Sequence, residues 1–167
     1  MMIFEREFSF KEWFFLLILL LVWITSCSPK EIDELDLNDP PYIYSSLEVE
    51  ILLRVNSYRR SKGLKELDQL EEISRQALLH NGHMIRANEV CHHNFGGRYR
   101  VLVKQVGASA MAENVGFGYR TSGAFVEAWV RSKGHREILE KQHSHFGISA
   151  AAGDDEKVYV TLIFVRK

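Results

Sequence analysis

The hydrophobic positions that follow residue 44 first recur with the period of an amphipathic helix. Its apolar side is formed by Leu47, Ile51, Leu52, Val55 and Tyr58. This spacing predicts a helix that begins at Ser45, because every third or fourth residue falls on one helical face. Gly63 stands where a glycine commonly caps the C-terminal end of a helix.

A second helix is predicted to start near Asp68. The Asp68 side chain can cap free backbone amides, and Glu71 and Glu72 suit the positive end of the helix dipole. The spacing of apolar residues predicts which face is buried. The predicted buried positions are Leu70, Ile73, Ala77, Leu78 and Met84.

Two further segments follow the glycine pair Gly96-Gly97. A shorter segment covers 99–106 and is closed by Gly107. A third helix is predicted from Ser122, as its cap, to Gly134. Its apolar face contains Phe125, Val126, Trp129 and Val130.

The end of the chain reads as a hairpin of two strands. The first covers 146–150, a polar turn covers 153–157, and the second strand covers 158–165. The second strand is apolar on both alternating faces, which is typical of a central strand covered by helices on each side. The order of helices followed by a hairpin predicts an α+β fold, arranged as a three-layer α/β/α sandwich in one domain.

The first 27 residues have the pattern of a signal peptide. An unbroken apolar run extends from Trp13 to Ile24, with Arg6 and Lys11 before it. A run of this length suits a signal-peptide core better than a membrane span. The run ends in Ile24-Thr25-Ser26-Cys27, which resembles the bacterial lipobox and predicts acylation of Cys27. Three glutamates before the run leave a single-pass anchor or a buried helix as alternatives.

The segment 28–44 contains five acidic residues and then Pro40-Pro41. This composition predicts an extended acidic tether between the lipid and the folded domain.

The chain has two cysteines. If Cys27 carries lipid, Cys91 has no partner, which excludes a disulfide framework. After residue 27 the chain has 19 basic and 19 acidic residues. A domain without net charge gives no electrostatic reason to bind nucleic acid.

Seven histidines form three groups along the chain, namely His80 and His83, then His92 and His93, and then His135, His143 and His145. The first pair is spaced to share one helical face and is expected to flank the surface of its helix. His143 and His145 alternate on an extended segment and are expected to point to one side, at a cleft rim or on an exposed loop.

An ordered set of short motifs now points to a family. In chain order these are Leu52-Leu53, Asn56-x-Tyr58-Arg59, Gly63-Leu64, Ala77-x-x-His80, Met84, His92, Phe95-x-x-Arg98, Gly107, Glu113-Asn114, Ala128-Trp129, Gly134-His135-Arg136 and Phe146-Gly147-Ile148. With this set, residues 45–167 resemble bacterial CAP-domain proteins, also called SCP or PR-1-like. The resemblance implies an α/β/α sandwich whose cleft gathers two histidines and one or two glutamates, with a divalent metal in several members.

Carried over position by position, the cleft residues of the family fall on His92, Glu113 and His135. Ala112 stands where the family has glycine before its glutamate. The family's second glutamate would fall on Ser132, so the full set of four is absent. The chain also appears one residue shorter before Phe146, which leaves the alignment of His143 and His145 open.

Two interpretations of these residues remain. Two neutral imidazoles and a carboxylate are a competent ligand set for a divalent metal such as zinc, with water in the fourth position. Alternatively, Glu113 and the histidines only hydrogen-bond across a polar cleft and hold loops in place, with His93 and Ser132 in supporting positions. Asn114 is expected to fix backbone through its amide, and Trp129 to lie in the core.

Three functions follow from the sequence. The first is a non-enzymatic binding module at the cell envelope, anchored to a membrane and directed at a small ligand, a lipid or a protein. The second is a metal-dependent hydrolase of peptide or cell-wall material, for which Glu127 is the nearest candidate base. The third is a purely structural lipoprotein. A serine hydrolase is not indicated, because no G-x-S-x-G motif occurs.

Overall fold

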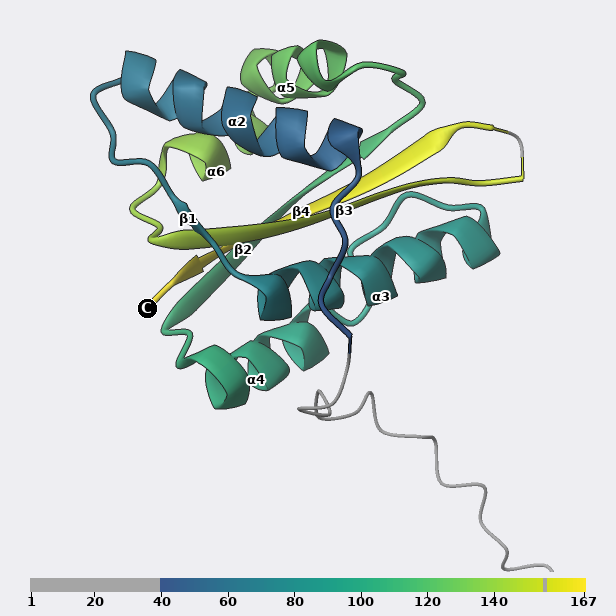
Figure 1. Cartoon of the computed structure of the whole chain (residues 1–167), viewed down its shortest axis with the longest axis horizontal. Coiled ribbons are helices and arrows are strands. Elements are labelled where there is room, and N and C mark those ends of the chain that lie inside the picture. The colour runs from purple at the N-terminus through teal and green to yellow at the C-terminus, as the bar shows by residue number, and fades with distance from the viewer. Residues whose placement is uncertain (1–39, 155) are drawn as a thin grey trace, which may run out of the picture. The chain divides into compact units, whose positions relative to one another are not determined.

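The structure is a computed structural model, and it describes residues 40–154 and 156–167. Helices and strands are interspersed along the chain, which ends in two consecutive strands (Figure 1). The elements are α2 (Ser46–Ser61), β1 (Asp68–Gln69), α3 (Glu71–Ala87), α4 (Phe95–Val106), β2 (Ala110–Phe117), α5 (Ser122–Arg131), α6 (Lys133–Glu140), β3 (His145–Ala152) and β4 (Val158–Arg166). The mixture of helices with one sheet confirms the predicted α+β class.

The four strands form one sheet in the order β1-β3-β4-β2. The β3–β4 hairpin is antiparallel, and β2 joins the other side of β4, also antiparallel. The short strand β1 runs parallel to the start of β3, where Asp68 pairs with His145. The predicted central position of the last strand is therefore confirmed.

Helices cover both faces of the sheet, as Figure 1 shows, with α2, α5 and α6 on one face and α3 and α4 on the other. The side chains of β4 alternate between two hydrophobic clusters. Leu162 packs into the first cluster with Ile51 and Phe125, and Ile163 packs into the second with Ile73 and Leu102. This alternation makes the predicted three-layer sandwich, because successive residues of a strand point to opposite faces.

Helix α2 begins and ends as the sequence predicts. The Ser45 hydroxyl accepts a hydrogen bond from Glu48 N, and the Glu48 carboxylate accepts one from Ser45 N at 2.7 Å. This reciprocal pair is a capping box, which satisfies two backbone donors that the helix itself leaves free. Beyond the helix, Gly63 has a φ of 71°, a conformation that glycine adopts without strain.

The second helix departs from its predicted start and face. Asp68 lies in β1 and does not cap the helix, which begins at Glu71 with Leu70 before it. Pairing of Asp68 and Gln69 with β3 fixes this backbone as a strand and prevents an earlier helical turn. Leu78 was predicted to be buried, but it is 47% exposed because it lies on the outer side of α3.

Besides β1, two further elements were not predicted. Strand β2 covers 110–117, and α6 starts at Lys133, directly after α5. Gly134 was predicted to end a helix but lies inside α6, because the chain turns at Ser132 and resumes helical conformation. The cap of α5 is Thr121, whose hydroxyl accepts from Ala124 N at 3.2 Å, and not Ser122.

The last residues of the predicted tether contact the domain. The Tyr42 hydroxyl donates to the buried carboxylate of Glu48 at 2.9 Å, and the Tyr44 hydroxyl pairs with that of Ser74 at 2.7 Å. Residues 28–39, the apolar run and Cys27 lie outside the described residues. Within the described residues, none of the helices has the length and apolar character needed to cross a membrane.

Candidate functional site

The polar centre of the molecule is Glu113 on β2, which is only 3% exposed. One carboxylate oxygen, Oε2, accepts a hydrogen bond from Arg98 Nη2 at 2.8 Å. The other, Oε1, lies 2.7 Å from His92 Nδ1. A carboxylate can only accept, so this nitrogen of His92 carries the proton, and Nε2 is the free acceptor when the imidazole is neutral.

Arg98 is placed by α4 and held on two sides. Its guanidinium pairs with Glu113 and also donates to the carbonyl of His93, in the loop that leads into the helix. The guanidinium is 4% exposed, so both charges of the pair are removed from water. Separating the two groups would leave a buried charge without its counter-charge, which costs about 3–5 kcal/mol. The pair is therefore expected to keep its geometry.

His80 lies behind Glu113, on α3, and is 2% exposed. Its Nδ1 pairs with the hydroxyl of Thr161 on β4 at 3.0 Å and lies 3.6 Å from Glu113 Oε2. Burial lowers the pKa of His80 to about 3, and the positive charge of Arg98 adds to this effect. His80 was expected at the surface of its helix, and the structure corrects that expectation, since α3 turns this side chain toward the sheet.

His135 lies on the opposite face of β2 from Glu113. Asn114 follows Glu113 and therefore points to the α5 and α6 layer, where its Nδ2 donates to the carbonyl of His135 at 3.1 Å. His135 Nδ1 pairs with the hydroxyl of Ser132 at 2.9 Å. The expected role of Asn114 in fixing backbone is thus observed.

His92 lies in the loop before α4 and His135 lies on α6, and the two imidazoles interact electrostatically. Burial lowers the pKa of His135, and the charge of His92 contributes in the same direction. His135 is therefore neutral at neutral pH, while the side chain of His92 is 52% exposed. The site thus consists of two imidazoles on either side of β2, each fixed through Nδ1 and with no hydrogen-bond partner at Nε2 among the described residues.

Metal binding by His92, Glu113 and His135 stays a prediction. No group of three His, Cys, Asp or Glu side chains among the described residues is placed to hold one ion. The reason lies in Glu113, whose two oxygens face Arg98 and His92 inside the protein. Glu113 orients His92 here and does not reach toward His135 as a third ligand.

The remaining candidate residues lie outside this site or only support it. The ring of His93 stacks on that of His83, with centroids 4.3 Å apart. Glu127 pairs with Arg131 at 3.6 Å and is 71% exposed. His143 stacks on Phe164 beside β4 instead of lying on an exposed loop, and its Nε2 faces the carbonyl of Ile138.

Two other residues of the sequence analysis, Trp129 and Cys91, can be located in the structure. The indole of Trp129 is buried in the core and donates to the Val115 carbonyl at 2.8 Å. Cys91 is a free, half-buried thiol beside the cluster of Met84, Val115 and Tyr159. The burial of Trp129 and the absence of a disulfide at Cys91 among the described residues agree with the sequence analysis.

Sequence reasoning missed the two side chains that complete the network, Arg98 and His80. Both stood in the motifs that carried the family resemblance, Phe95-x-x-Arg98 and Ala77-x-x-His80. Both residues are far from Glu113 along the chain, so their spacing did not indicate that they contact it. A basic residue among apolar helical neighbours was the available signal that Arg98 is buried with a partner.

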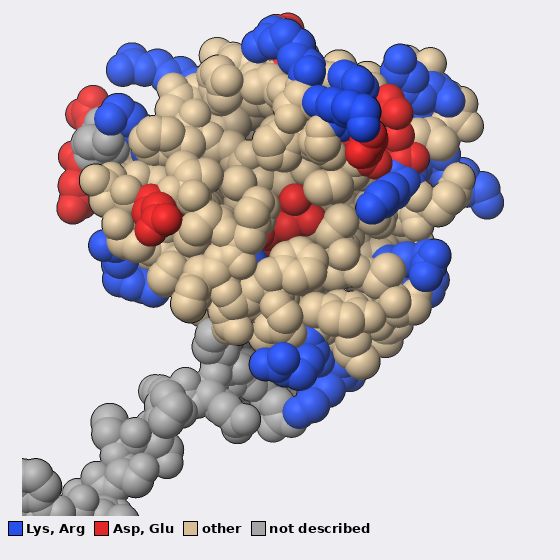
Figure 2. All heavy atoms as spheres, turned by 180° about the vertical axis from the view of Figure 1, so that it is seen from behind, with Lys and Arg blue, Asp and Glu red and all other residues tan. Residues whose placement is uncertain are grey.

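The surface opposite the view of Figure 1 is hollowed near its middle. Figure 2 shows acidic atoms recessed there, within a largely uncharged area, and Lys and Arg side chains toward the rim. A three-layer sandwich with a histidine and glutamate cleft between its helix layers defines the class of CAP-domain proteins. The chain belongs to this family, the cysteine-rich secretory protein family, whose sequence pattern matches residues 52–164.

Comparison with known proteins supports this membership. The chain is 30% identical to the uncharacterized protein YkwD of Bacillus subtilis over 113 residues, which is 65% of this chain and 44% of that protein. It is 29% identical to the uncharacterized membrane protein YlbC of the same species, over 75% of this chain and 36% of that protein. The chain therefore spans less than half the length of these relatives.

Solved structures show the same fold at low identity. An outer surface protein of Borrelia burgdorferi superposes with a TM-score of 0.65 and 16% identity, covering 77% of this chain and 99% of that one. A cysteine-rich secretory protein of Staphylococcus aureus gives a TM-score of 0.61 and 22% identity, covering 72% and 38%. The similarity at this level concerns the fold.

Proposed function

We propose that this CAP-domain protein is a lipid-anchored module of the bacterial cell envelope that binds a polar ligand between His92 and His135. The observation that carries the proposal is the pair of fixed imidazoles with open Nε2 atoms on either side of β2. Neutral imidazole nitrogens accept hydrogen bonds, so a suitable ligand carries hydroxyl or amide donors. The outer surface protein among the structural relatives supports an extracellular setting.

The same geometry favours binding over hydrolysis. A hydrolase needs a general base within reach of its water. The carboxylate of Glu113 is occupied by Arg98 and His92, and Glu127 is paired with Arg131 on the surface, so neither carboxylate is free to act as that base. The imidazoles of His92 and His135 are the remaining candidate bases at the site, but no group of three metal-ligating side chains is found among the described residues. We therefore place metal-dependent hydrolysis second, and derive no step that passes through a metal.

The ligand proposal is tested on residues 35–167, which form a compact unit that contains the hydrophobic clusters described above. Soluble muropeptides from cell-wall digests are one probe, since they carry hydroxyl and amide donors, and Zn²⁺ is the other. Nitrogen NMR of the imidazoles is the measurement. We expect muropeptides to shift Nε2 of His92 and His135.

The controls separate binding from catalysis. A His92→Ala/His135→Ala double variant is expected to lose the response, and His145→Ala, which alters a histidine on β3, is expected to keep it. Mass spectrometry of the muropeptides is expected to show no cleavage. Unshifted imidazoles contradict the proposal, and Zn²⁺-dependent cleavage would favour the hydrolase.

The anchor is tested in cells with an alkyne analogue of palmitate, using the full chain. We expect the protein to take up the label and to sediment with membranes. Cys27→Ser is expected to remove the label, while Cys91→Ser keeps it because Cys91 is half-buried in the folded domain. Labelling that survives Cys27→Ser would show that Cys27 is not the acylated residue.

A further inference from the structure

The outer surface of α3 and α4 combines exposed apolar and basic side chains. Its apolar members are Leu78 and Leu79 on α3, each 47% exposed, and Val103 on α4. Its basic members are Arg86, Arg100 and Lys104, all exposed. These six residues are called the α3/α4 surface below. Apolar and basic residues on one helical surface are typical of attachment to a lipid interface.

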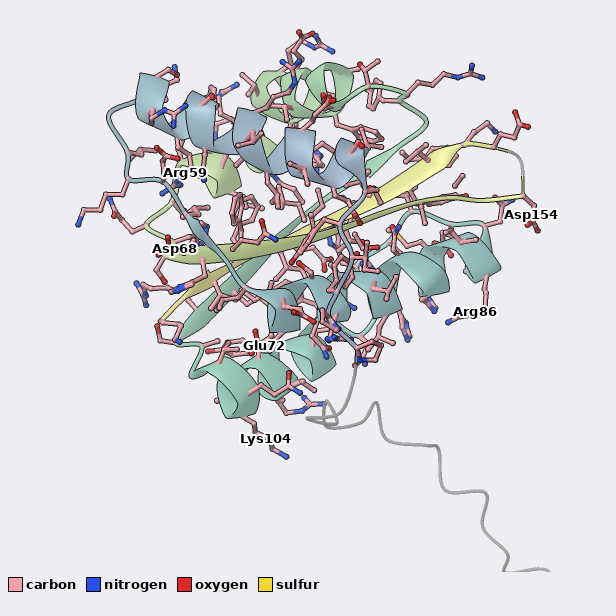
Figure 3. The ribbon with its side chains drawn as sticks, viewed as in Figure 1. Arg59, Asp68, Glu72, Arg86, Lys104 and Asp154 are labelled. Carbon is pink, nitrogen blue, oxygen red and sulfur yellow. The ribbon has the colours of Figure 1, made fainter. Side chains whose placement is uncertain are left out.

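The charged members of the α3/α4 surface are all basic, although α3 begins with Glu71 and Glu72 and Arg75 pairs with Glu71. Between Ile73 and Ala112 the sequence contains a single acidic residue, Glu89. Arg98, in the same stretch, is buried against Glu113 and does not reach this surface. Figure 3 shows Arg86 and Lys104 pointing away from the sheet and Glu72 near the start of α3, and in Figure 2 Lys and Arg side chains gather on the lower side, where α3 and α4 lie.

The chain enters the described domain beside this surface. Arg75 on α3 donates to the carbonyl of Pro40, the first described residue. Leu78 and Leu79 follow Arg75 by one helical turn and so lie on the same side of α3. Residues 28–39 separate Pro40 from Cys27, and a fully extended segment of this length spans at most about 40 Å. An anchor at Cys27 would keep the α3/α4 surface close to the bilayer.

We propose that the α3/α4 surface docks on a membrane rich in anionic lipid. The basic side chains would interact with the head groups, and Leu78, Leu79 and Val103 would enter the interface. The inference rests on the proposed function for one point only, the location of the protein at the cell envelope. The docking surface itself is defined by the described residues. Each Lys or Arg near an anionic surface contributes about a fivefold gain in partitioning.

The test uses residues 35–167, which lack Cys27, with vesicles of phosphatidylcholine alone or mixed with phosphatidylglycerol. Sedimentation is expected to show binding to the anionic vesicles only, weakened by salt. The triple variant Arg86→Gln/Arg100→Gln/Lys104→Gln is expected to lower partitioning about a hundredfold. A triple variant in or beside the other helix layer, Arg120→Gln/Arg131→Gln/Lys133→Gln, changes the charge equally and is expected to bind nearly as the parent does.

Two variants at exposed apolar positions complete the test. Leu79→Gln is expected to lower partitioning severalfold, whereas Leu53→Gln, on the exposed side of α2, is expected to have no effect. Circular dichroism checks that each variant is folded. No binding by the parent, or equal losses in the two triple variants, would overturn the proposal. Because Cys27 is absent from the sample, failure here leaves the acylation and ligand tests unaffected.

Discussion

At the scale of single residues, Glu113 determines the arrangement of the site. Its carboxylate is buried and receives hydrogen bonds from a guanidinium and an imidazole that come from different segments. In a poorly solvated position these contacts are strong, and the loss of one partner is costly. The side chain therefore joins α4, the loop before it and β2 into one polar unit.

We expect Glu113→Gln to lower the free energy of unfolding by about 3–5 kcal/mol, because the guanidinium of Arg98 would stay buried without a counter-charge. Urea unfolding, followed by circular dichroism, measures the change. Glu127→Gln removes an exposed carboxylate that also pairs with an arginine, and it is expected to cost less than about 1 kcal/mol. If the two substitutions lower the free energy of unfolding equally, the buried pair contributes no more to stability than the exposed pair.

At the scale of elements, α3 and β3 pack unusually closely where they cross. A Cβ added at Gly147 on β3 would lie 2.4 Å from the backbone nitrogen of Ser74 and 2.7 Å from the Cβ of Ile73. The hydroxyl of Ser74 also accepts from Ile148 N at 3.1 Å, which satisfies an edge amide of β3. The absence of a side chain at Gly147 is thus what lets the helix lie against the strand.

Gly147→Ala is expected to destabilise the domain by about 3 kcal/mol or more, since backbone atoms cannot move aside as a flexible side chain can. Thermal unfolding of the purified domain is the measurement. Gly134→Ala is the matched control, because a Cβ there meets nothing within 4 Å and α6 is helical at that residue. The control is expected to be neutral or to stabilise by up to about 1 kcal/mol. A mild effect at Gly147 would contradict the close packing.

At the scale of the whole molecule, two imidazoles are held neutral by burial. Burial lowers the pKa of His143 to about 4, with only partial compensation from the carbonyl of Ile138, and that of His80 to about 3. In the unfolded chain both groups titrate near 6.5. Below that pH the unfolded state binds more protons than the folded state, so acid favours unfolding.

The free energy of unfolding is therefore expected to fall as the pH is lowered from about 6.5 to about 4, by up to about 1.4 kcal/mol per pH unit for each of these histidines. Urea unfolding at a series of pH values gives the slope. His143→Gln is expected to reduce the slope in this range, and NMR titration of the parent is expected to show a neutral His143 down to about pH 4. An unchanged slope in the His143→Gln variant would contradict the contribution of His143 to the pH dependence of stability.

The sequence by itself determined the elements whose signals are local. Helix α2 followed from its apolar spacing and from Gly63 at its C-terminal end, and β4 followed from a run that is apolar on both faces. The order of such elements was enough for the α+β sandwich, and a set of short motifs was enough for the family. These features depend on neighbouring residues, so no long-range contact was needed to infer them.

The tertiary structure alone decided the features that depend on residues far apart in the chain. Strand β2 was invisible in the pattern because Glu113 and Asn114 interrupt it, and their burial is possible only with partners from α4 and α6. Asp68 became a strand residue because β3 pairs with it. Arg98 and His92 likewise engage both oxygens of Glu113, a contact that spacing along the chain cannot reveal.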